Sequence, residues 1–217
     1  MEKPITKFWE IKLEALTEAL TKNNFEVYLA NTGEDAKNLV LDTLLPRLSP
    51  ETISWGGSLS YIQTGLYAEL KERQDITVLD TYDKNLSPEE AYELRRRSLL
   101  VDLFITGTNA VTETGRLVNL DMIGNRVAAI TFGPKNVILF IGRNKIVADV
   151  DEAIERIKTY AAPVNVMRLE KKTPCLKTGV CQNCKSPERI CNAWSISEKS
   201  FPKGRINVIL INEDLGF

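Results

Sequence analysis

The sequence contains no histidine. This absence excludes Ser-His-Asp and Cys-His catalysis, and it restricts any protein-held metal to cysteine, carboxylate or carbonyl ligands. General acid–base chemistry would fall to Glu, Asp, Lys, Tyr or Cys. The chain also lacks an excess of either charge, because 28 lysines and arginines oppose 29 acidic residues. Nucleic-acid binders usually carry a basic excess, so we expect no nucleic-acid partner.

Long hydrophobic runs are absent as well. No apolar stretch approaches the ~20 residues that cross a bilayer, so we expect no membrane span. The first segment, MEKPITKFWEIKLEAL, alternates charged and apolar residues and has no signal-peptide core, which predicts a cytoplasmic protein. With 217 residues, of which 43% are hydrophobic and 26% charged, the chain suits one α/β domain over residues 1–217.

The spacing of apolar residues predicts the order of the elements. Helical spacing predicts helices over 5–22, 32–46, 58–70, 87–100 and 149–162. Short apolar or β-branched runs predict strands over 25–30, 52–55, 76–79, 101–106, 127–132, 136–141 and 206–211. The Thr-, Asn- and Gly-rich stretch 106–126 predicts two further short strands with tight turns. Because helices alternate with strands early and strands cluster later, we expect a mixed sheet covered by helices.

The stretch from Thr52 to Leu70, TISWGGSLSYIQTGLYAEL, reads as a strand, a double-glycine turn and a helix. Gly56 and Gly57 allow a tight turn with uncovered amides, and Ser58 is a favourable N-cap residue. A glycine turn at a helix N-terminus favours a bound anion, so these three residues predict a cradle for a carboxylate or phosphate. The alternative is an ordinary tight strand-to-helix turn.

All four cysteines lie within 17 residues, in a segment over 173–194 that is inserted before the last strand. Disulfides are disfavoured because nothing indicates an oxidising compartment. Both a four-thiolate zinc site and an iron–sulfur cluster are compatible with the C-x5-C-x2-C-x6-C spacing, and reduced thiols in a loop are the alternative. Six basic side chains against two acidic ones over 168–191 would offset the charge of thiolates. The candidate metal ligands are Cys175, Cys181, Cys184 and Cys191.

A second candidate site follows the apolar strand that ends at 106. Glu113 stands in a Thr- and Gly-rich turn, where a partly desolvated carboxylate could act as base or nucleophile; otherwise it is a surface residue of the turn. Arg126 could hold a substrate carboxylate or phosphate with two hydrogen bonds, or form a surface ion pair. The candidate ligand-binding residues around them are Thr114, Gly115, Asn119 and Asn125.

Several motifs resemble the LUD-domain family, which is named after lactate utilisation. They are SWGGS at 54–58, AVTETGRLVNLD at 110–121, the Gly124-Asn125-Arg126 turn and FGPKNVILFIGRNKIV at 132–147. The resemblance covers the chain from about Phe8 to Leu169. It implies a Rossmann-like α/β domain of the CoA-transferase and sugar-phosphate-isomerase-like fold, with ligands near glycine-rich loops. Residues 56–58 match the glycine-turn element, and Glu113 matches the turn carboxylate of CoA transferases.

The resemblance implies a protein of lactate or organic-acid utilisation that binds a small anionic metabolite between the glycine turn and the Glu113–Arg126 region. The cysteine segment would hold an iron–sulfur cluster or zinc, and the partners would be iron–sulfur or oxidoreductase proteins. One alternative is a transferase or hydrolase that acts on a CoA ester or sugar phosphate, with Glu113 as nucleophile or base. Another is a non-catalytic accessory subunit.

Overall fold

A six-stranded sheet forms the centre of the molecule. The computed structural model describes residues 2–217, and every pair of neighbouring strands in this sheet is parallel. Both faces of a parallel sheet are usually covered, and its strands are accordingly rich in Val, Ile and Leu. In spatial order the strands are β1 (Glu26–Ala30), β10 (Ile206–Ile211), β7 (Asn136–Gly142), β4 (Leu103–Gly107), β2 (Thr52–Trp55) and β3 (Thr77–Leu79).

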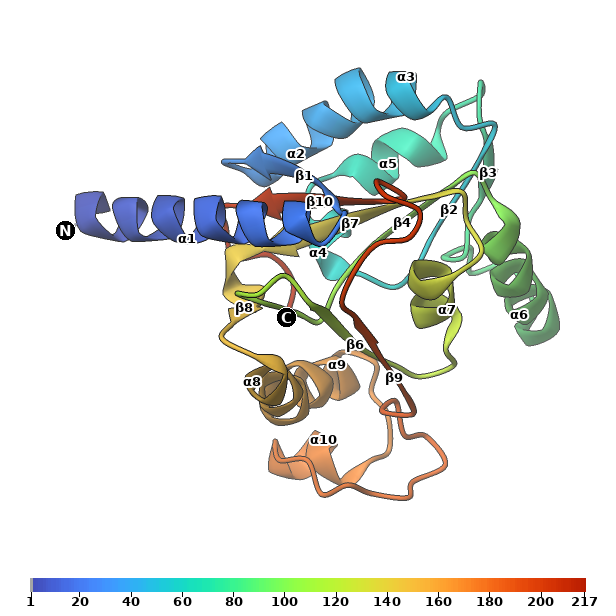
Figure 1. The fold of residues 1–217 in the computed structure, drawn as a ribbon. Helices are drawn as coiled ribbons and strands as arrows, with labels where there is room; N and C mark the ends of the chain where they lie inside the picture. Colours follow the sequence, from blue (N-terminus) through green and yellow to red (C-terminus); the bar gives the residue numbers. More distant parts are fainter. Residues whose placement is uncertain (1) are drawn as a thin grey trace.

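Helices cover both faces of this sheet (Figure 1). On one side lie α2 and its continuation into α3, together with α5; on the other lie α1 and α7. Successive side chains of β7 point to opposite faces of the sheet. Ile138 and Phe140 pack in the core under α2, α3 and α5, and Val137 and Leu139 pack in the core under α1 and α7. The helices are α1 (Glu2–Lys22), α2 (Gly33–Leu39), α3 (Leu45–Leu48), α4 (Leu59–Ile62), α5 (Leu66–Lys71), α6 (Pro88–Arg97), α7 (Asn125–Thr131), α8 (Val150–Arg156), α9 (Ala162–Arg168) and α10 (Pro174–Thr178).

The strands that cluster late in the sequence form a separate four-stranded sheet. One face packs toward α1 through Val111 and Leu117, and the other packs on α8 through Ala110 and Val118. β5 and β6 form an antiparallel hairpin, β8 runs parallel to β5, and β9 runs antiparallel to β6. In spatial order these strands are β8 (Ile146–Val147), β5 (Ala110–Thr112), β6 (Leu117–Asp121) and β9 (Ala193–Ser197).

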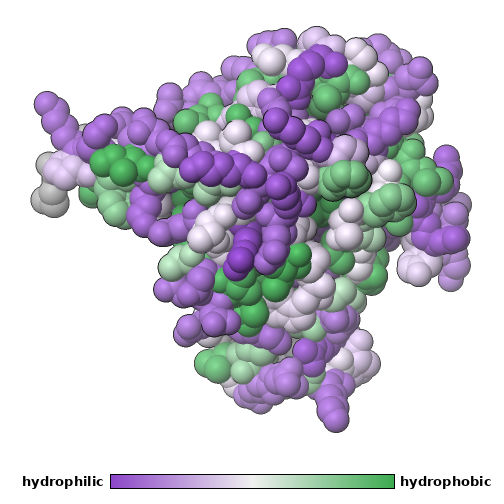
Figure 2. All heavy atoms as spheres, viewed as in Figure 1, coloured by the Kyte–Doolittle hydropathy of each residue, from purple (hydrophilic) through white to green (hydrophobic). Residues whose placement is uncertain are grey.

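The α/β fold class predicted from the sequence is confirmed, and so are its two strongest helix starts. The side chains of Thr32 and Ser87 each accept a hydrogen bond from the backbone N–H at the third helical position, and the acidic side chains there accept one from the backbone N–H of Thr32 and Ser87. The visible surface is mainly hydrophilic, with small separate apolar patches (Figure 2). Within residues 2–217, no helix combines the length and apolar character that crossing a bilayer requires.

Three local predictions are wrong. Residues 127–132 are not a strand, because α7 occupies them and buries Val127, Ala129 and Ile130 against the parallel sheet. The expected helix over 58–70 is two short helices, α4 and α5, separated at Gly65, whose φ of +81° is left-handed. Pro163 does not stop the helix that begins at 150, because a wide π turn over Ile157–Ala161 carries the chain into α9.

Candidate functional site

A cavity of about 750 Å³ lies at the carboxyl ends of the central parallel strands. Its wall includes Gly57 after β2, Tyr82 after β3 and Thr108 after β4. After β2 the chain moves outward to β3 and then returns to place β4 on the other side of β2. Such a reversal of strand order opens a crevice at the carboxyl edge, which is where open α/β sheets bind their ligands.

The charges that line the cavity are mostly positive. Asp121 is the acidic side chain in the lining, and it faces five basic ones. Because the walls of a cavity have a low dielectric constant, a one-signed set of charges there raises the local concentration of opposite charge. The cavity is therefore suited to an anion. Its basic residues are Arg95, Arg126, Lys145, Arg168 and Lys171.

The glycine turn forms one wall of this cavity. The Gly56 N–H donates to the Ile105 carbonyl at 3.0 Å, and the Ser58 N–H donates to the Tyr82 hydroxyl at 3.2 Å. Two of the three amides expected to face an anion are thus bound within the chain. Gly57 lines the cavity, and a Cβ added there would meet open space.

Ser58 precedes α4, as expected, but its side chain does not cap the helix. The hydroxyl oxygen is buried and has no hydrogen-bond partner within residues 2–217. It lies against Gly107, where an added Cβ would come within 2.5 Å of it. The absence of a side chain at Gly107 therefore makes the room for the Ser58 hydroxyl beside the cavity.

Arg126 is buried and holds the second wall together. One terminal nitrogen donates to the Gly107 carbonyl at 3.0 Å and the Asn119 side chain at 2.6 Å. The other donates to the Asn109 side chain at 2.7 Å and the Leu120 carbonyl at 2.9 Å. The guanidinium thus spans β4, β6 and their loops with all four terminal N–H groups engaged. Direct clamping of a ligand by Arg126 stays a prediction, and any such contact would have to replace one of these bonds.

Lys145 contributes a buried amine to the same cavity. It follows β7, and its Nζ donates to the Ser60 hydroxyl at 2.7 Å and the Thr108 carbonyl at 3.0 Å. Its pKa is lowered to about 7, mainly by burial and additionally by the positive charges of Arg156 and Arg126. Lys145 lies within the motif at 132–147, but nothing in the sequence singled it out as a site residue.

Glu113, Thr114 and Gly115 lie elsewhere. They form the turn of the β5–β6 hairpin, which rests on the carboxyl end of α1 and is not part of the cavity lining. Asn23 donates to the Thr114 and Gly115 carbonyls at 3.0 and 3.1 Å, and Glu113 forms an ion pair with Lys12. Among the other predicted ligand residues, Asn125 lines the cavity, whereas Asn119 lies behind its wall as a partner of Arg126.

The model of the LUD domain matches residues 13–211. The chain belongs to the LUD-domain family. The match spans both sheets and the cysteine segment, and it leaves out the first half of α1 and residues 212–217.

A solved structure supports the fold of this LUD domain. The crystal structure of a DUF162 family protein from Deinococcus radiodurans is similar with a TM-score of 0.52, covering 93% of this chain and 97% of that chain. The sequence identity is 16%, so this likeness concerns the fold. No curated protein is significantly similar to this chain.

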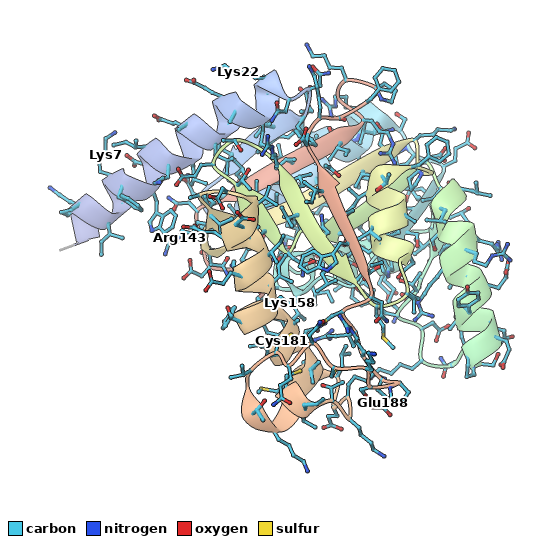
Figure 3. All side chains as sticks on the ribbon, turned by 60° about the horizontal axis from the view of Figure 1, so that its bottom comes forward. Lys7, Lys22, Arg143, Lys158, Cys181 and Glu188 are labelled. Carbon is cyan, nitrogen blue, oxygen red and sulfur yellow. The ribbon has the colours of Figure 1, made fainter. Side chains whose placement is uncertain are left out.

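The cysteines of this LUD domain all line one small cavity of about 20 Å³. Cys175 is on α10, and the other three are on the following loop, with Lys158 of the neighbouring helical segment close to Cys181 (Figure 3). Arg189 ties the loop together by donating to the Cys184 and Cys191 carbonyls at 2.6 and 2.8 Å.

Burial raises the pKa of the Cys191 thiol, and nearby Cys181 and Cys175 raise it further, against the effect of Lys158 and Arg189. Within residues 2–217, no three cysteine or acidic side chains already stand in a metal-ligand arrangement. The four free thiols therefore border one cavity, but within residues 2–217 they do not stand around a common centre.

Proposed function

We propose that this LUD-domain protein binds a small anionic metabolite of lactate or other organic-acid utilisation in the cavity at the carboxyl edge of the parallel sheet. The observation that carries the proposal is the lining, in which five basic side chains surround a space bordered by one acidic residue. A volume of about 750 Å³ falls in the range of small-molecule sites. The buried Ser58 hydroxyl without a partner adds a polar atom that a ligand could satisfy.

Gly57→Val tests this binding site. The added side chain meets open space and no left-handed backbone, so the fold should be retained while the cavity is partly filled. We expect calorimetric titration with lactate, oxalate and inorganic phosphate to show binding to the wild-type protein that Gly57→Val abolishes. Thr77→Val, which adds apolar surface on an exposed position of β3, is the matched control and should bind normally. If Gly57→Val binds these anions as the wild type does, the cavity is not their binding site.

The proposal extends to a metal at the four cysteines. Their thiols are soft ligands of the kind that zinc and iron–sulfur clusters take, and all four border the same cavity. A space of about 20 Å³ accommodates roughly one water-sized particle, so its size favours a single ion such as Zn²⁺ over a cluster. Bound there, the ion would cross-link α10 to the loop that follows it.

Metal analysis of anaerobically purified protein decides between the ions. We expect one zinc per chain, with no visible colour, and loss of the metal in Cys181→Ser. Val180→Ala, at the exposed neighbouring position, is the control and should retain it. A brown protein that contains iron and sulfide would indicate an iron–sulfur cluster instead of a single zinc ion, and would favour an oxidoreductase partner. Protein without metal under these conditions would remove this part of the proposal.

The alternative of a transferase or hydrolase requires Glu113 beside the substrate. Its distance from the cavity lining and its pairing with Lys12 weigh against that role. Glu113→Gln should therefore leave anion binding unchanged. If Glu113→Gln instead abolished turnover of a CoA ester or sugar phosphate, the transferase alternative would replace the binding proposal. A non-catalytic accessory subunit would bind the same anions without turnover.

A further inference from the structure

Lys145 is enclosed by groups that accept hydrogen bonds. The Ser60 hydroxyl donates its own hydrogen to the Leu215 carbonyl at 3.2 Å, so toward Lys145 it can only accept. The Thr108 carbonyl is also an acceptor. Within residues 2–217, no carboxylate forms an ion pair with this lysine. The positive charges of Arg156 and Arg126 act on it and lower its pKa.

The two hydrogen-bond acceptors around Lys145 Nζ match the neutral form of its amine. An amine group has two N–H donors and a lone pair, whereas an ammonium group has three donors and none. An ammonium at this position would leave one donor buried without a partner, beside two positive charges. The arrangement therefore keeps the lone pair of Lys145 Nζ available in a residue that lines the cavity.

We propose that Lys145 is an amine nucleophile that forms an imine with the carbonyl group of a small anionic carbonyl compound, such as a 2-oxo acid, bound in the cavity. The inference rests on the proposed anion binding and names its ligand class. The remaining basic lining residues, such as Arg168 and Lys171, supply the charge that holds the carboxylate of such a compound.

The step is balanced without a redox partner. The Nζ lone pair attacks the carbonyl carbon, a carbon–nitrogen bond forms, and the carbonyl oxygen leaves as water with the two amine hydrogens. A desolvated lysine in its neutral form is the usual nucleophile for such chemistry. At pH 7 a lysine with a pKa near 7 has a neutral fraction roughly a thousand times that of a surface lysine.

Reductive trapping with glyoxylate tests the proposal. Sodium cyanoborohydride at pH 7 delivers hydride to the imine carbon and leaves one carboxymethyl group on the amine that reacted. Peptide mass mapping of the wild-type protein then locates this group. We expect it on Lys145 at about tenfold or higher occupancy relative to Lys135, an exposed lysine paired with Asp102. The group should disappear from this position in Lys145→Met and persist in Lys135→Met.

Oxalate, an anion without a reactive carbonyl, separates the two proposals. If oxalate binds but glyoxylate labels only exposed lysines, the imine is overturned and the anion site stands. If neither oxalate binding nor a Lys145 adduct is found, both fail. Because mapping is done on the wild-type protein, the location of the adduct does not depend on whether Lys145→Met folds.

Discussion

At the scale of single residues, three basic side chains near the cavity are held in different ways: Arg126 and Lys145 are buried, and Arg156 is half-buried. Arg126 and Arg156 donate to backbone carbonyls and amide oxygens, which solvate a permanent charge in place of water. Among residues 2–217, Lys145 finds two acceptors, and it can lose its proton. The same region therefore contains fixed positive charges that attract an anion and one amine that can react.

The stability of the fold should depend on the protonation of Lys145. Its pKa is about 7 in the folded protein, below the ordinary value of 10.5, so the unfolded chain binds more protons between these values. The free energy of unfolding should therefore rise as pH increases from about 7 toward 10.5, and Lys145→Met should remove that part of the slope. Urea unfolding at a series of pH values measures it. An identical slope in the wild type and the variant would contradict the lowered pKa.

Asp102 should also give stability that rises with pH, but in the acid range. One carboxylate oxygen accepts from the Thr52 N–H at 2.9 Å and the Thr52 hydroxyl at 2.8 Å, and the other contacts Lys135 at 2.6 Å. The Lys135 hydrogen bond is the main cause that lowers the pKa of Asp102 from 3.8 to about 2. Its stabilisation is thus complete above pH 3.8 and lost as pH falls toward 2.

We expect Asp102→Ala to lower the free energy of unfolding at pH 7 by about 2 kcal/mol, because two backbone amides and a hydroxyl lose their acceptor. The control is Asp75→Ala, which removes an exposed carboxylate paired with Arg73 and should have a much smaller effect. Equal losses in both variants would show that Asp102 acts only as a surface charge.

Residue-level prediction from the sequence succeeded where the chemistry is local. The capping boxes at Thr32 and Ser87 depend on residues three positions apart, so the sequence contains the whole interaction. The partners of Arg126 lie on other elements, 6 to 19 residues away, and those of Lys145 lie 37 and 85 residues away. Their burial depends on tertiary packing, and the same residues read as surface positions in the sequence.

At the scale of elements, the β5–β6 hairpin turn is shaped to dock on α1. Gly115 has a φ of +79°, and a Cβ there would lie 2.9 Å from the Leu20 nitrogen and 3.0 Å from the Ala19 carbonyl carbon. We expect Gly115→Ala to destabilise the protein by about 2 kcal/mol or more, through backbone strain and displacement of α1. Gly57→Ala, at an open position without left-handed backbone, should stay close to the wild type. Thermal unfolding of both variants measures the difference.

The helices that continue past a proline and the helix α7 differ from the sequence pattern for two physical reasons. Pro46 and Pro163 each follow a π turn, and each occupies the first turn of the next helix, where its missing N–H costs little. Residues 127–132 contain β-branched side chains, which indicated a strand. They form a helix because Asp121 accepts a hydrogen bond from the Arg126 N–H at the start of α7, and because the apolar face of α7 is buried against the sheet. In α7, tertiary contacts therefore outweigh local propensity.

At the scale of the whole molecule, the two cavities are neighbours. Ile190 lines both of them, and the continuous helical segment from 150 to 168 contributes Ile157 to the large cavity and Lys158 to the cysteine cavity. One layer of side chains thus separates the proposed anion site from the proposed metal site. Occupancy of one site can change the stability of the wall that it shares with the other.

If a metal fixes the cysteine loop, the affinity of the large cavity should depend on that metal. Removing the metal frees the loop that holds Ile190, and the wall then has to be ordered when the anion binds. We expect chelation to weaken oxalate binding about fivefold or more, and oxalate to strengthen metal binding by the same factor, because the coupling is reciprocal. Ile190→Ala should reduce this coupling, whereas Val180→Ala, on the exposed side of the loop, should not. Hydrogen exchange over 173–194 should rise on chelation. Equal oxalate affinity with and without metal would show that the two sites are not coupled through the shared wall.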